Sequence, residues 1–145
     1  MTQKNEKNCK QCACSKDTCN EFQTHVHEFS GSTMLGAPQD RQDLLHNHRF
    51  AGVTGPEIEK TGGHVHILSV NSDFFFNHFH DIEVETGPPI PVKDQNGNVI
   101  GHIHGFSGTS SCVFFHDHNF KGSTLIQNPI QMQTLDNFNS SDLDF

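Results

Sequence analysis

The sequence predicts an all-β fold of three repeated histidine-rich β-hairpins with internal pseudo-threefold symmetry, in a barrel, prism or sandwich-like arrangement. Three observations support this prediction. All twelve histidines fall into six His-x-His pairs, and a large apolar residue follows two positions after each pair. Segments 63–92 and 101–130 align with each other at a constant offset, which indicates an internal repeat. No long segment has the apolar spacing of a helix.

The histidine pairs define the repeating unit. Alternate residues of a strand share one face, so both histidines and the following apolar residue are expected on the same side. The pairs are His25/His27, His46/His48, His64/His66, His78/His80, His102/His104 and His116/His118, followed by Phe29, Phe50, Leu68, Ile82, Phe106 and Phe120.

Length and charge limit the class of protein. A chain of 145 residues is long enough for one domain with a modest core. The net charge of -8 argues against a nucleic acid or an anionic membrane as partner. No apolar run approaches a membrane span, and the first residues lack the apolar region of a signal peptide. We therefore expect synthesis in the cytoplasm, and a later spore or cell-surface location stays open.

Residues 1–21 are expected to form a flexible cysteine-rich arm. Cys9, Cys12, Cys14 and Cys19 have the spacing C-x2-C-x-C-x4-C. Three interpretations compete: disulfides, including cross-links between subunits; a thiolate metal site; or reduced thiols on a mobile tail. Cys112 brings the count to five, so at least one thiol is left over within a monomer.

Residues 22–130 are expected to form the three-repeat β domain, with hairpins at 22–56, 63–92 and 101–130. In the second hairpin, Asn71, Ser72 and Asp73 are typical turn residues. A turn centred there places His66 opposite His78 and His64 opposite His80. The same register in the other hairpins pairs His25 with His48, His27 with His46, His102 with His118, and His104 with His116.

The remaining segments connect or follow the hairpins. The segment PIPVKDQNGNVI predicts a small extra hairpin, because Asn96-Gly97 is a favoured two-residue turn. Phe74, Phe75 and Phe76 are expected in core and edge packing. Residues 131–145 are polar and are expected to form a C-terminal tail.

The histidines predict transition-metal sites. Buried imidazoles without partners are costly, and neighbouring protonated rings repel one another. A bound ion removes both problems, and neutral imidazole is a common ligand of Zn, Cu and Ni. Four imidazoles on one hairpin face can meet one ion, which gives up to about three ions per chain. Sharing each ion between hairpins, or stacking ions on the pseudo-threefold axis, is the open alternative.

No carboxylate or thiolate recurs with the histidine pairs. Glu28, Asp81, Glu83 and Asp117 fall on the opposite strand face and are expected to be solvated; the alternative for Asp81 or Asp117 is a hydrogen bond that orients a histidine ligand. The chain has no H-E-x-x-H motif and no nucleophile elbow, so the sequence identifies no small-molecule substrate.

Several of these motifs, in one order, resemble the YmaF family of small bacterial proteins. The similarity covers residues 22–130 and rests on HVHEFSGST, HNHRFAGVTG, GGHVHIL, NHFHDI and TGPPIPV. It implies a bacterial source, chiefly spore-forming Gram-positive lineages, and a spore or surface role. The cysteine arm lies outside the shared motifs.

These observations together predict a non-catalytic, metal-binding structural protein that self-assembles into a ring, a fibre or a spore or surface layer. The cysteine arm would cross-link its subunits. One alternative is a metalloenzyme whose all-histidine site activates water or oxygen. Another is a metal storage or sequestration protein.

Overall fold

The computed structural model describes residues 25–128 of the chain as an all-β structure with one short 3-10 turn at Gln42–Leu44. The first half holds β1 (Val26–Ser32), β2 (Arg49–Val53), β3 (Ile58–Lys60), β4 (Gly63–Val65) and β5 (Ile67–Asn71). The second half holds β6 (Asp81–Glu85), β7 (Pro89–Lys93), β8 (Val99–Thr109), β9 (Asn119–Ser123) and β10 (Gln127–Asn128).

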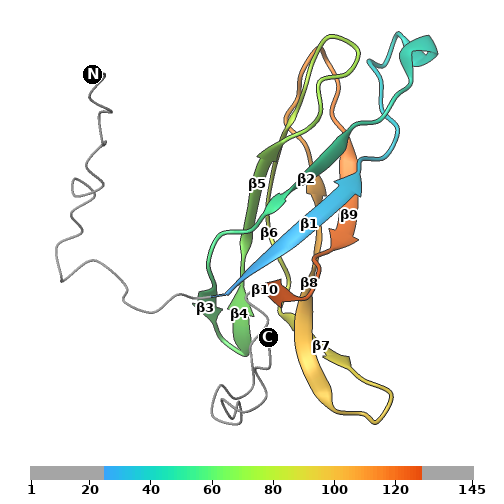
Figure 1. The fold of residues 1–145 in the computed structure, drawn as a ribbon. Helices are drawn as coiled ribbons and strands as arrows, with labels where there is room; N and C mark the ends of the chain where they lie inside the picture. The colour runs from blue at the N-terminus through green and yellow to red at the C-terminus, as the bar shows by residue number, and fades with distance from the viewer. Residues whose placement is uncertain (1–24, 129–145) are drawn as a thin grey trace, which may run out of the picture.

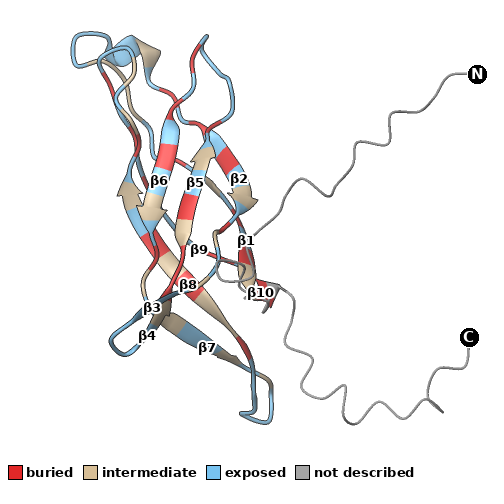
Figure 2. Ribbon diagram, turned by 90° about the vertical axis from the view of Figure 1, so that its left-hand side faces the viewer, coloured by how far each residue is buried: buried red, intermediate tan, exposed pale blue. Residues whose placement is uncertain are grey.

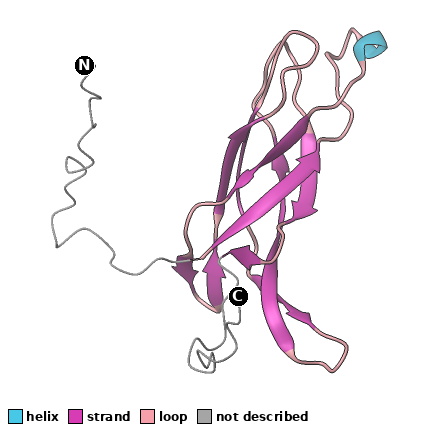
Figure 3. Ribbon diagram, viewed as in Figure 1, coloured by secondary structure: helices cyan, strands magenta, loops and turns pink. Residues whose placement is uncertain are grey.

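The strands form four small antiparallel sheets, ordered β10-β1-β2, β3-β4, β5-β6 and β7-β8-β9. Figures 1 and 3 show them lying along one long axis, with β3, β4, β7 and β10 at one end and the β1–β2, β5–β6 and β8–β9 loops at the other. The all-β class is confirmed. None of the described sheets closes on itself, and the internal threefold symmetry stays a prediction.

The hairpin register differs from the one expected. Ser72 does not mark the turn of the second hairpin; β5 pairs with β6 from Ile67↔Glu85 to Asn71↔Asp81. The turn lies further along, where Phe75 bridges to His78. The same shift occurs in the first hairpin, in which Phe29 pairs with Gly52 rather than Leu44. Each hairpin is therefore longer than predicted, and its two histidine pairs lie at opposite ends.

Two of the turns are held in an unusual backbone conformation. Phe76 and Asn77 have φ angles of 51° and 62°, and Phe114 and Phe115 have 47° and 61°. Two consecutive positive φ values between bridged residues define a type I′ turn, which normally takes Asn or Gly. The phenylalanines at 74, 75 and 76 are exposed, so the expectation that they pack in the core is wrong.

The apolar core lies midway along the hairpins. It consists of the apolar residues that follow the six histidine pairs: Phe29, Phe50, Leu68, Ile82, Phe106 and Phe120. Figure 2 shows buried residues alternating with exposed ones along β2, β5 and β6. In the first and third hairpins each core phenylalanine pairs across the strands with a glycine, whereas the second hairpin pairs Leu68 with Val84 and Val70 with Ile82.

The connecting segments bear out part of the sequence analysis. The extra hairpin at Asn96-Gly97 is present as β7 and β8, with a φ of 82° at Gly97. Residues 58–65, which include His64, form a further short hairpin, β3-β4. The cysteine arm with Cys9, Cys12, Cys14 and Cys19, and the tail 131–145, lie outside the described residues. Within residues 25–128, no helix is long and apolar enough to cross a membrane.

Candidate metal centres

The six histidine pairs gather into two groups of six rings. Group A contains His25, His27, His64, His66, His102 and His104; group B contains His46, His48, His78, His80, His116 and His118. The ligand nitrogens of each group lie within 4.8 Å of one another.

Each main hairpin contributes one pair to each group. His27 is the second residue of β1, while His48 directly precedes β2, so the two pairs lie at opposite ends of the first hairpin. The predicted grouping, with four imidazoles of one hairpin around one ion, is therefore wrong. The residues that the structure describes form two groups rather than three, in the stacked arrangement that the sequence left open.

The nitrogen spacing within the groups matches an octahedron. In group A, the Nε2 atoms of His25, His64 and His102 are 3.0–3.1 Å apart. In group B, the corresponding distances among His46, His78 and His116 are 3.1–3.3 Å. Adjacent ligands of an octahedron are √2 times further apart than metal and ligand. A spacing near 3.1 Å thus corresponds to a metal–nitrogen distance of about 2.2 Å, close to ordinary imidazole coordination.

Backbone carbonyls fix which ring nitrogen faces the centre. His27 Nδ1 lies 2.9 Å from the Leu125 oxygen, His66 Nδ1 2.8 Å from Gly55, and His104 Nδ1 2.8 Å from Gly87. Because a carbonyl oxygen can only accept, each Nδ1 carries the proton and Nε2 keeps a free lone pair. All six histidines of group B make the same kind of bond, to Leu44, Asp73, Phe76, Ser111, Phe114 and Met34.

Hydroxyl groups hold the backbone of the six most deeply buried histidines. Thr54 accepts a hydrogen bond from the His27 backbone N–H, and Thr33 accepts one from that of His48. The remaining acceptors follow the same rule: Thr86 for His66, Ser72 for His80, Thr124 for His104 and Ser110 for His118. These hydroxyl acceptors were not predicted from the sequence, although a Thr or Ser stands six residues after the second histidine of every pair.

The Nε2 atoms of neighbouring histidines approach one another without a proton between them. His46 and His78 each donate Nδ1–H to a carbonyl, so neither has a proton on Nε2, yet these two Nε2 atoms are 3.2 Å apart. The Nε2 atoms of His27, His80 and His118 are buried with no hydrogen-bond partner among the described residues. Buried acceptors that converge without a donor are unfavourable. A cation at the centre of each group could satisfy these acceptors.

Two carboxylates lie at the edge of the groups. Asp73 Oδ1 is 3.2 Å from Nδ1 of His48, and Glu57 Oε2 is 3.5 Å from Nδ1 of His25. Neither residue was predicted from the sequence. Such outer carboxylates orient metal-binding imidazoles and raise their basicity. The acidic residues that were expected to be solvated, Glu28, Asp81, Glu83 and Asp117, are exposed.

Burial lowers the pKa of histidines in both groups. Removal from water, with repulsion from neighbouring histidines, lowers the pKa of His25 to about 4 and that of His102 to about 3. Desolvation is also the largest cause that lowers the pKa of His27 and of His118 to about 4. Neutral imidazole is the form that binds a metal.

Comparison with known proteins places the chain. Residues 22–126 match YmaF, described as spore germination protein GerY/YamF. The chain belongs to the YmaF family. The match contains all six histidine pairs, from His25 to His118. No curated protein and no solved structure matches the chain.

Proposed function

We propose that this YmaF-family protein is a non-catalytic structural protein of the spore that holds two transition-metal ions, one in group A and one in group B. The observation that carries the proposal is the convergence of six Nε2 lone pairs, one histidine pair from each main hairpin, at octahedral spacing. Each ion would tie the three hairpins together at one end of the core. Binding energy to a site that the unfolded chain lacks is folding energy.

The geometry favours ions that accept six nitrogen ligands. Structural zinc is almost always four-coordinate, and Cu(II) prefers a tetragonal geometry. Ni²⁺, Co²⁺ and Fe²⁺ suit six imidazoles better. Six protein ligands also fill the octahedron, whereas catalytic metal sites keep a position open for water or substrate. This argues for a structural role over the metalloenzyme alternative, and two ions per chain are few for a storage protein.

Elemental analysis of tag-free protein tests the proposal. The four cysteines of the arm are replaced (C9S, C12S, C14S, C19S), so that only the histidine groups are counted. We expect two ions per chain, and a melting temperature that falls by roughly 20 °C or more after chelation, since two saturated sites add several kcal/mol to folding. His66→Ala should remove one ion and His80→Ala the other, while Glu83→Gln, on the exposed face, should keep both.

The other outcomes separate the alternatives. A single ion with unchanged stability would favour the metalloenzyme. Weak, reversible binding with little effect on melting would favour storage. Protein that binds no metal at physiological concentrations would overturn the proposal.

The self-assembly part of the proposal rests on the exposed phenylalanines beyond group B. Six of them are 44–90% exposed: Phe74, Phe75, Phe76, Phe79, Phe114 and Phe115. At about 200 Å² per side chain they expose about 700 Å², close to the 800 Å² that each partner buries in a stable complex. Exposed apolar patches of this size mark interaction sites. We propose that a second copy of the chain covers this end.

Sedimentation velocity over a range of concentrations tests this surface. Phe115→Asn removes the most exposed ring but retains a residue that tolerates positive φ, so the turn keeps its shape. We expect the parent protein to associate and the variant to do so at least tenfold more weakly. Phe115→Asn protein that self-associates as well as the parent, or a parent that stays monomeric, would contradict the proposed surface.

A further inference from the structure

The two histidine groups differ in their contact with solvent. All six histidines of group B are buried. In group A, His27, His66 and His104 are buried, whereas His25, His64 and His102 are only partly so. The three partly buried rings form the outer face of group A, at the end of the molecule where β3, β4, β7 and β10 lie (Figure 1).

The outer rings of group B are held on both sides. His46, His78 and His116 each bond through Nδ1 to the carbonyl of the residue two positions earlier, at 2.8–3.0 Å. Phenylalanine rings pack against two of the three: Phe76 lies 5.0 Å from His46 and Phe114 lies 5.5 Å from His78, measured between ring centres. The positive φ angles of these two phenylalanines form the turns that place both carbonyl and ring.

The outer rings of group A lack this support. Among the described residues, no acceptor lies within hydrogen-bonding distance of Nδ1 of His64 or His102, and His25 has only the Glu57 carboxylate at 3.5 Å. A ring held only by its own rotamer and by the ion can turn away at low cost. The second contacts that hold a ligand in place are worth 10–100-fold in metal affinity.

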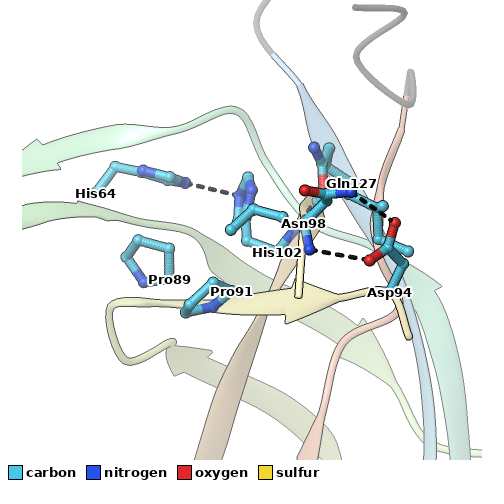
Figure 4. A pocket seen from close by; sticks show the side chains of 10 residues that line it. His64, Pro89, Pro91, Asp94, Asn98, His102 and Gln127 are labelled. Carbon is cyan, nitrogen blue, oxygen red and sulfur yellow. Dashed lines mark hydrogen bonds between the residues drawn. The ribbon is translucent and has the colours of Figure 1, made fainter. Parts of the chain in front are cut away.

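A pocket of about 860 Å³ opens beside the two least supported rings. His64 and His102 line it together with Pro89, Pro91, Asp94, Asn98, Val99, Ile100, Gly101 and Gln127. Figure 4 shows both imidazoles at the pocket, with Nε2 of one 3.1 Å from Nε2 of the other. This volume is ample for several water molecules or a small chelating molecule beside the ring that leaves the ion.

We infer that group A is the exchangeable metal site, where ions enter and leave through the pocket at His64 and His102, while group B retains its ion for as long as the chain stays folded. The inference rests on the proposed function, since it needs an ion in each group. Exchange begins when His64 or His102 turns into the pocket and water takes its place on the ion. In group B, His78 lines a smaller pocket, of about 300 Å³.

Chelation kinetics on the nickel-loaded, full-length protein test the inference. The variant without the four cysteines of the arm is loaded with nickel chloride, mixed with excess EDTA, and sampled for nickel content. We expect two phases of equal size, with one ion lost at least tenfold faster than the other. Paramagnetic shifts in the proton NMR spectrum identify the site, because the histidine signals of group A should return to diamagnetic positions in the fast phase.

Matched outer-ring variants provide the second measurement. The double variant H64A/H102A should lose the fast phase and keep one slowly released ion, whereas H78A/H116A should keep the fast phase; circular dichroism shows whether each variant folds. If a variant fails to fold, the NMR assignment on the parent protein still decides. Equal release rates, or group B emptying first, would overturn the inference. A chain that binds no nickel would overturn the proposed function, and the inference with it.

Discussion

At the scale of single residues, the histidines are arranged as acceptors. In nine of the twelve rings Nδ1 lies against a backbone carbonyl, so the tautomer is set by the fold before any ion arrives. This order reduces the entropy that binding would otherwise cost. The sequence predicted all twelve histidines as ligands, because none occurs outside a His-x-His pair. It did not reveal the carbonyls, since any residue supplies one.

The lowered pKa values predict that acid destabilises the protein. Burial brings the pKa of His25 and His27 to about 4, while an unfolded histidine titrates near 6.5. Between these values the unfolded chain binds more protons than the folded one. The free energy of unfolding is therefore fully retained above pH 6.5 and falls as the pH drops towards 4. Protons also compete with the metal, in the same direction.

Thermal melting of metal-free and metal-loaded protein between pH 7.5 and 4.5 checks this prediction. Both melting temperatures should fall steadily below pH 6.5, with the larger fall in the loaded protein. A flat profile down to pH 5 would show that the histidines do not lose protons on folding.

At the scale of the hairpin, the register shows where sequence reasoning failed. Asn71-Ser72-Asp73 has the composition of a turn, but Ser72 instead accepts the His80 backbone N–H from within the hairpin. The real turns contain Phe76-Asn77 and Phe114-Phe115, and only the asparagine is typical of positive φ. Local propensity was overridden because this register buries both histidine pairs. The Thr or Ser that recurs six residues after each histidine pair is the sequence signal for this register.

The glycines opposite the core phenylalanines give a prediction at this scale. A Cβ added at Gly52 would lie 2.6 Å from a Val70 methyl carbon and 2.9 Å from the Phe29 ring. Gly52→Ala should therefore lower the free energy of unfolding by about 1–3 kcal/mol through overpacking. Gly105→Ala is the control, because nothing lies within 4 Å of its added Cβ.

Urea denaturation of the two variants and the parent measures the difference. Gly105→Ala should leave stability unchanged or raise it by up to about 1 kcal/mol. Equal stability of both variants would show that the close packing of ring on glycine is not a feature of the folded core.

At the scale of the whole molecule, the chain stacks three layers along its long axis: group A, the apolar core and group B. The all-β class and the apolar residues of the core followed from the period of the His-x-His-x-apolar motif. The grouping of the histidines did not, because it depends on which end of each hairpin a pair occupies. In the observed register, each of the three hairpins places one histidine pair at each of its two ends. Six rings therefore meet at each end, where four had been expected.

X-ray absorption spectroscopy at the nickel edge measures the number and kind of ligands around each ion. We would load the protein without its four arm cysteines with two equivalents of Ni²⁺ and fit the coordination shell. We expect six nitrogen ligands at about 2.1–2.2 Å, with the outer-shell pattern of imidazole rings. A four-coordinate shell, or a shell dominated by water oxygen, would contradict the claim that six histidines from three hairpins hold each ion.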